Sequence, residues 1–299
     1  MIKINFYNNV TDISLNIDNI DILNLLYKRE KNIKSCPHCN STKFIKYGYY
    51  KTLQRFKCTS KICNKTFSAT TKSICSYSKK NFDIWKSYFK LMAENKTLVE
   101  CSKALNIHNT TAFYWRHKIL VAMKSSFITS PLKEFIEINT FRFKENFKGC
   151  KNISTTERKT IWLLSAVDIR NNILSEIVSV GSISIPIIKN SIYKKIPKDA
   201  YIRTYLHNYL RAIEIMHNKN LTTSHPEDKE LVRSFSKFIA RWFDKFNGVA
   251  TKYLNSYLIW YILTFKKYYY NFSKFIIDLT LENSFTRFKD FRLFNLSFN

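Results

Sequence analysis

The sequence predicts a multidomain protein of the mixed α/β class, and three features support this. Paired cysteines near the N-terminus flank a stretch rich in tyrosine and phenylalanine. Helical periodicity follows at 81–124, and from about residue 134 short apolar strands precede longer helices. Strands followed by a helix, a further strand and long helices imply a layered α/β domain. A chain of 299 residues is long enough for about two domains.

The composition favours a polyanionic partner. Lys and Arg number 49 against 22 Asp and Glu, which gives a formal net charge of +27. This excess favours nucleic acid over a membrane surface, although AT-rich codon usage accounts for part of the lysine content. Hydrophobic residues make up 45% and aromatic residues 16% of the chain. That is enough for a buried core, so disorder over the bulk of the chain is excluded.

Neither a targeting segment nor a membrane span is expected. Residues 1–10 lack the apolar core of a signal peptide. The most apolar run, 257–265, is far shorter than the roughly 20 residues that a span requires, and it is predicted to be a buried helix. Seven unevenly spaced cysteines do not form a secreted disulfide framework. We therefore expect a cytoplasmic protein with no membrane partner.

Four cysteines form the strongest local signal. A Cys-Pro-His-Cys knuckle and a second cysteine pair with four intervening residues stand about 18 residues apart, and FIKYGYYKTLQRF between them predicts a β-hairpin. Two tight turns joined by a hairpin can present four thiolates to Zn²⁺ at about 2.3 Å. Because such a site has no open position, we predict one structural Zn²⁺ per chain rather than two chance cysteine pairs. The predicted ligands are Cys36, Cys39, Cys58 and Cys63.

The segment 81–124 predicts three helices. Thr97 and Glu100 form a capping box at the start of the second helix, and a turn near Asn106 leads into the third. This is the helix-turn-helix pattern, in which the last helix enters the major groove of double-stranded DNA. A three-helix bundle with a solvated basic face is the alternative. The predicted DNA contacts are Thr110, Thr111, Tyr114, Arg116, His117 and Lys118.

From about residue 134 onward, the pattern predicts alternating strands and helices. No Gly-rich phosphate loop, nucleophile elbow or HExxH pair is present, which argues against the enzyme classes that use them. The predicted strands are 134–138, 160–167, 173–180 and 201–205, and the predicted helices include 206–217 and 229–246.

Several motifs occur in an order that resembles a known family. After the CPHC knuckle come WRHKI at 115–119, EINTFRFKENFKG at 137–149 and RWFDKFNGVATKYLNSYLIW at 241–260. Together they resemble bacterial insertion-sequence transposases with an N-terminal zinc ribbon and an ISXO-type, RNase H-like domain of the DDE class. The resemblance extends over roughly residues 33–262, and the FNGVATKYLNSYL block is the most specific part of it.

The resemblance implies a division of the chain into five parts. The C-terminal part, residues 263–299, is expected to contain an added packing helix. The alternative is that its aromatic residues stack on single-stranded nucleic acid. The parts are an N-terminal extension (1–33), the zinc ribbon (34–72), the helix-turn-helix domain (80–125), the RNase H-like domain (132–262) and a basic aromatic tail (263–299).

The resemblance also implies a chemistry that this sequence has lost. Such enzymes transfer DNA strands with two divalent ions held on carboxylates. Here the three metal-binding positions are Asn139, Tyr205 and Arg233. An amide, a phenol and a guanidinium cannot neutralise two Mg²⁺ ions. We therefore expect a nucleoid-associated DNA-binding protein without catalytic activity, acting as a domesticated regulator or, through mixed oligomers, as an inhibitor of active relatives.

Other interpretations are open at this stage. The runner-up is an active transposase that cleaves and joins DNA with Mg²⁺, and an inert relic is a third. The resemblance implies a homo-oligomer, or a mixed oligomer with active relatives. In the active form, a rebuilt metal site would use Glu137, Asp168 or Asp199. Alternatively, Arg203, Arg233 and Arg241 would form a basic phosphate-binding site, here called the cationic floor, in place of the metal ions.

Overall fold

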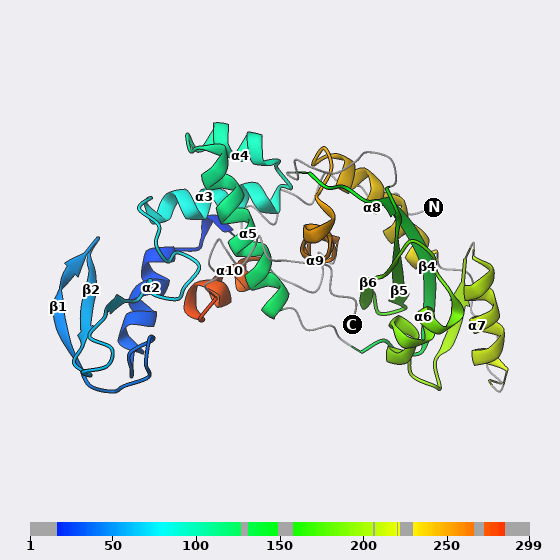
Figure 1. Ribbon diagram of the computed structural model, residues 1–299, viewed down its shortest axis with the longest axis horizontal. Coiled ribbons are helices and arrows are strands. Elements are labelled where there is room, and N and C mark those ends of the chain that lie inside the picture. The colour runs from blue at the N-terminus through cyan, green and yellow to red at the C-terminus, as the bar shows by residue number, and fades with distance from the viewer. Residues whose placement is uncertain are drawn as a thin grey trace. The chain divides into compact units, whose positions relative to one another are not determined.

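The computed structural model forms two compact units (Figure 1). One unit comprises residues up to Ser125 together with a segment that begins at Lys267, and the other is built mainly from Ser126–Lys266. The structure describes residues 17–126, 131–148, 158–205, 207–219, 221, 230–265 and 272–284.

The first unit combines a small sheet with helices. Its sheet has the order β1-β2-β3, and both pairings are antiparallel. The strands are β1 (Phe44–Tyr50), β2 (Leu53–Cys58) and β3 (Thr66–Ser68). The helices are α2 (Ile22–Lys31), α3 (Phe82–Ala93), α4 (Leu98–Ala104), α5 (Asn109–Ser126) and α10 (Phe272–Leu281).

The predicted hairpin is confirmed as β1 and β2. Its inner face is aromatic, because Phe44, Phe56 and Phe67 lie within 5.4–5.6 Å of one another, measured between ring centroids. Two features of its backbone require left-handed φ angles. Gly48 (φ 72) lies in the irregular part of β1, and Lys51 (φ 47) and Thr52 (φ 68) form the two-residue turn.

The predicted helices of 81–124 are confirmed as α3, α4 and α5. The Thr97–Glu100 capping box is present, with each side chain accepting the other residue's backbone N–H. Helices α3 and α5 meet through the rings of Trp85 and Trp115, which stack with their centroids 3.9 Å apart. The Tyr88 hydroxyl adds a hydrogen bond to the Ala112 carbonyl at 2.5 Å.

Helix α10 belongs to the first unit and packs against α2. The Arg29 guanidinium donates to the carbonyls of Thr280, Leu281 and Glu282 and to Asn283 Oδ1. A cation at the C-terminal end of a helix satisfies carbonyls that have no partner within the helix and complements its dipole. Residues 272–281 therefore form the expected packing helix. Residues 263–265 of the predicted tail belong to α9, and residues 266–271 and 285–299 lie outside the described residues.

The second unit is a mixed sheet with helices on both faces. Its strand order is β6-β5-β4-β7, with β4, β5 and β6 antiparallel and β7 parallel to β4. The strands are β4 (Phe135–Lys144), β5 (Thr160–Asp168), β6 (Ile173–Val180) and β7 (Tyr201–Thr204). The helices are α6 (Ile185–Asn190), η1 (Ile192–Lys195), α7 (Asn208–Asn218), α8 (Leu231–Asp244), η2 (Thr251–Tyr253) and α9 (Leu254–Phe265).

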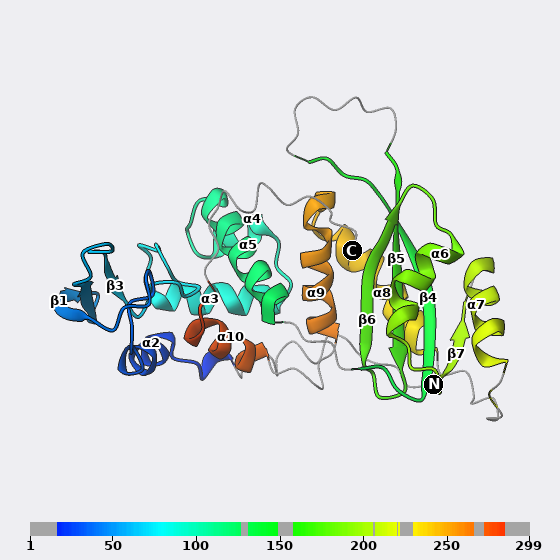
Figure 2. The same cartoon turned by 60° about the horizontal axis from the view of Figure 1, so that its bottom comes forward.

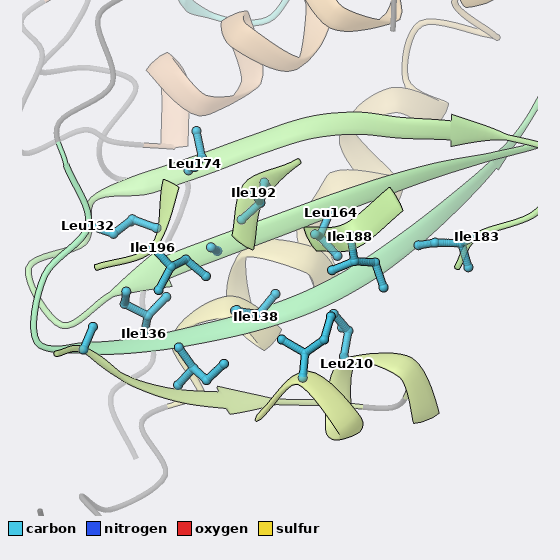
Figure 3. Close-up of a cluster of buried hydrophobic side chains, with 14 residues drawn as sticks. Leu132, Ile136, Ile138, Leu164, Leu174, Ile183, Ile188, Ile192, Ile196 and Leu210 are labelled. Atoms are coloured by element: carbon cyan, nitrogen blue, oxygen red, sulfur yellow. The ribbon is translucent and has the colours of Figure 1, made fainter. Parts of the chain in front are cut away.

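The hydrophobic core of this unit lies between the sheet and α6, η1 and α7. Alternate residues of β4 and β5, among them Ile136, Ile138 and Leu164, pack there against Ile188 and Leu210 (Figure 3). Helix α8 lies on the opposite face of the sheet from α6 (Figure 2) and packs against β4 and β5.

The predicted strands and helices of this unit are confirmed, with differences at β4 and after β6. Strand β4 continues to Lys144, well beyond the predicted end at residue 138. Helices α6 and η1 were not predicted, because each is too short for its periodicity to be recognised. The apolar run at 257–265 lies in the buried helix α9. Among the described helices, none is both long enough and apolar enough to cross a bilayer.

The left-handed residues of the hairpin generate a stability prediction. Gly48→Ala should lower the free energy of unfolding by about 1 kcal/mol, because a Cβ at φ 72 is strained even though it meets no atom within 4 Å. Thr52→Gly should raise the free energy of unfolding by a similar amount, since Thr52 is exposed and loses little packing. Denaturant unfolding of both variants checks this, and a loss of stability in Thr52→Gly would contradict it.

Candidate metal centre and catalytic positions

The four predicted cysteine ligands form one cluster. Their Sγ atoms all lie within 4.8 Å of one another. The Sγ atoms of Cys36 and Cys63 are 3.8 Å apart, and those of Cys39 and Cys58 are 3.6 Å apart. Four sulfurs arranged tetrahedrally at about 2.3 Å from a metal would be separated by roughly 3.8 Å. The cluster could therefore hold one metal ion.

Two similar turns place these sulfurs. The Cys36 carbonyl accepts the Asn40 N–H at 2.8 Å, and the Ser60 carbonyl accepts the Asn64 N–H at 3.0 Å. Both asparagines are left-handed, with φ 60 and φ 45, a conformation that Asn tolerates better than most residues. A hydrogen bond from the backbone of Lys65 lowers the pKa of Cys63, which favours its thiolate form.

The predicted DNA contacts on α5 divide into two groups. Thr110 is exposed, and Thr111 and Tyr114 are partly exposed. Arg116 and Lys118 are buried, as is His117. For the three buried residues the prediction of base contacts is wrong, because their side chains are inside the first unit.

Local contacts explain why these basic side chains lie inside. The Arg116 guanidinium donates to the Lys96 carbonyl at 2.5 Å. The Lys118 ammonium donates to the carbonyls of Ile74 and Ser76 at 3.0 and 2.7 Å. Burial lowers the pKa of Lys118 to about 8. Both cations therefore satisfy buried backbone carbonyls and stabilise the packing of α5.

The three positions that the family resemblance predicts to be metal-binding converge at one edge of the second sheet. Asn139 lies on β4 and is buried, and Tyr205 follows the adjacent parallel strand β7. The Tyr205 N–H donates to the Ile138 carbonyl at 3.2 Å. Arg233, in the first turn of α8, places its guanidinium carbon 5.2 Å from the centroid of the Tyr205 ring. Residues far apart in the sequence thus meet where β4, β7 and α8 come together.

Arg233 and Glu137 both have polar partners within the chain at this edge. Arg233 forms an ion pair with Glu230 at 2.9 Å. The fully buried Glu137 accepts the Val232 N–H at 3.0 Å, which places a carboxylate at the N-terminus of α8. Negative charge is favourable at a helix N-terminus. Glu137 therefore fixes α8 on the sheet, a role that sequence reasoning missed because the contact joins distant segments.

Asp168 and Asp199, the other acids considered for a rebuilt metal site, do not form such a site with Glu137. Asp168 is fully buried and accepts four hydrogen bonds, from Lys133 N, Arg170 N, Asn172 N and Asn172 Nδ2. In the register of β4 and β5, Glu137 pairs with Val167, so Glu137 and Asp168 face opposite sides of the sheet. Asp199 is exposed in the turn before β7.

The proposed cationic floor is also dispersed. The Arg203 guanidinium lies over the Phe135 ring at 5.7 Å. Arg241 is eight residues after Arg233 on the same helix, which separates them by about 12 Å along its axis. Three arginines spaced in this way do not make one phosphate-sized site.

Comparison with known proteins leaves these sites to be interpreted on their own geometry. No family model, curated protein or solved structure matches this chain. The candidate sites are therefore the four-cysteine cluster and the edge where Asn139, Tyr205 and Arg233 meet.

The burial of Lys118 generates a pH prediction. Its pKa is about 8 in the folded chain and near 10.5 when unfolded, so between these values the unfolded chain binds more protons and stability rises with pH. From pH 8 to 9.5, the free energy of unfolding of the wild type should rise by about 1–2 kcal/mol relative to that of Lys118→Met.

Lys124→Met is the matched control, because Lys124 is exposed on the same helix. Denaturant unfolding at both pH values measures the difference, and equal behaviour of the two variants would show that Lys118 is solvated.

Proposed function

We propose that this chain is a DNA-binding protein of transposase ancestry whose catalytic edge no longer binds metal ions. The observation that carries the proposal is the convergence of Asn139, Tyr205 and Arg233 on two adjacent parallel strands and the start of a helix. These are the positions that the family resemblance identifies as metal-binding, and they are distant from one another in the sequence.

The chemistry of this edge argues against strand transfer. Two-metal catalysis requires carboxylates that hold ions about 3.5–4 Å apart. Here Arg233 contributes a positive charge, Tyr205 stacks with it, and Asn139 is neutral. One carboxylate oxygen of Glu137 accepts the Val232 N–H of α8, and a single carboxylate does not supply the ligand set that two ions need. An ion pair between Glu230 and Arg233 further lowers the negative charge available to a cation.

The architecture supports the same ancestry. A sheet of order β6-β5-β4-β7 with helices on both faces is compatible with an RNase H-like domain. The three helices α3, α4 and α5 have the order and lengths of a helix-turn-helix domain. The four-cysteine cluster fits a structural Zn²⁺, which would complete the ribbon without supplying an open coordination position.

The net charge supports DNA as the partner. A formal charge of +27 favours contacts with phosphates, which give binding that is strong at low salt. In this proposal the protein is nucleoid-associated in the cytoplasm and acts as a regulator of transposition. A copy that binds DNA without cleaving it would also inhibit active relatives when it joins them in mixed oligomers.

The metal centre gives one test. Metal analysis of the purified chain should find about one zinc per chain, and Cys58→Ser should lose it, because three thiolates bind far less tightly than four. Ser60→Ala, at a partly exposed position of the same loop, is a control that should retain zinc because it removes no thiolate. Purified wild type with no zinc would contradict the assignment of a zinc ribbon.

The catalytic edge gives a second test. Nicking of supercoiled plasmid with Mg²⁺ or Mn²⁺ should be absent in the wild type and present in the triple variant Asn139→Asp, Tyr205→Asp, Arg233→Asn, which restores oxygen ligands. Gel-shift binding of duplex DNA at low salt should be seen for both proteins.

The two parts of the proposal, catalytic inactivity and DNA binding, would be contradicted by different results. Metal-dependent nicking by the wild type would show an active transposase. Failure of the wild type to retain duplex DNA at low salt would contradict DNA binding.

A further inference from the structure

The first strand of the ribbon carries large side chains that the fold leaves in solvent. Along β1, the exposed fractions are 53% for Ile45, 48% for Tyr47, 72% for Tyr49 and 46% for Tyr50. Contiguous exposed aromatic side chains are uncommon on a small domain and mark interaction sites. We call these four residues, with Arg55 and Lys57 of β2, the ribbon surface.

These side chains are not needed for the ribbon's own core. The aromatic core is formed by Phe44, Phe56 and Phe67 together with the metal cluster. Strand β1 is at the edge of its sheet, since the strand order is β1-β2-β3. Tyr47 and its neighbours are therefore available to a partner without any change in the fold.

Cations flank the exposed ring of Tyr47. The Arg55 guanidinium carbon lies 5.8 Å and the Lys57 ammonium 5.4 Å from its centroid. The sequence from residue 31 to 82 contains twelve Lys and Arg and no Asp or Glu. This stretch of the chain is thus strongly basic, which is complementary to a polyanion, and the Glu30 carboxylate of α2 that reaches β2 is engaged by the Gln54 N–H.

We infer that the ribbon surface binds single-stranded nucleic acid, with unpaired bases stacking on the tyrosines and the flanking cations holding phosphates. Aromatic rings beside basic side chains form the stacking platform that single strands use. In a duplex the base faces are already stacked on one another, so exposed rings would add little. This inference rests on the proposed function, because both require a nucleic-acid partner.

Two other features of the chain agree with this assignment. Arg116 and Lys118, the strongest basic candidates on α5, are buried. Pairing of β1 with a second copy through its open edge would bring two lysine-rich segments together, and like charge disfavours that arrangement. The basic aromatic surface therefore fits nucleic acid better than it fits another copy of this chain.

Fluorescence anisotropy with the full-length, metal-loaded protein tests the inference. The probes are a labelled oligo(dT) of about 20 nucleotides and a duplex of equal length, at one low salt concentration. Tyr47→Ala with Tyr49→Ala should weaken oligo(dT) binding at least about fivefold and duplex binding less than about twofold. The corresponding double Phe variant keeps both rings and should bind as the wild type does.

Tyr209→Ala is the matched control, because Tyr209 is 42% exposed on α7 in the second unit. It should leave oligo(dT) binding unchanged. A second variant, Arg55→Gln with Lys57→Gln, leaves the tyrosines in place. It should reduce the slope of log K against log salt by about 1.4, since each phosphate contact on a single strand contributes about 0.7.

Unchanged oligo(dT) binding by the double Ala variant would overturn the inference, and so would an unchanged salt slope in the double Gln variant. If the wild type still binds duplex in those cases, the proposed function stands and only the ribbon surface is wrong. A wild type that binds neither probe contradicts both. A double Ala variant that changes sedimentation while its oligo(dT) affinity is unchanged would instead identify a self-association surface.

Discussion

The parallel pairing of β4 with β7 is the constraint on which the second unit depends. It runs from Phe135 opposite Tyr201 to Ile138 opposite Thr204, and the Tyr205 N–H extends it by one more hydrogen bond. Because Ile138 and Thr204 are paired in parallel, the residues that follow them, Asn139 within β4 and Tyr205 just after β7, are brought together at this edge of the sheet. Glu137, on β4 itself, then fixes the N-terminus of α8 at that edge.

This arrangement is compatible with the proposed loss of catalytic acids. Clustered carboxylates repel one another unless a cation lies between them. Here the Glu230–Arg233 ion pair and the stacking of Arg233 on Tyr205 balance the edge without a metal. Tyr205 and Arg233 therefore make contacts of their own within the chain.

The positive charge of the chain serves two different purposes. Arg116 and Lys118 are buried and satisfy backbone carbonyls, whereas the cations around the hairpin lie at the surface. A net charge of +27 thus does not by itself identify a surface that could contact a polyanion. Burial decides which cations can reach a phosphate.

Local patterns in the sequence determined the cysteine knuckles, the hairpin, the capping box and the four strands of the second sheet. Each depends on residues close together in the chain, so spacing and periodicity suffice to find it. Tertiary structure alone decided that Ile74–Ser76 covers Lys118, that Asp168 faces away from Glu137 and that α10 packs on α2. These outcomes depend on contacts between distant segments and on strand register, where a shift of one residue would reverse every side chain.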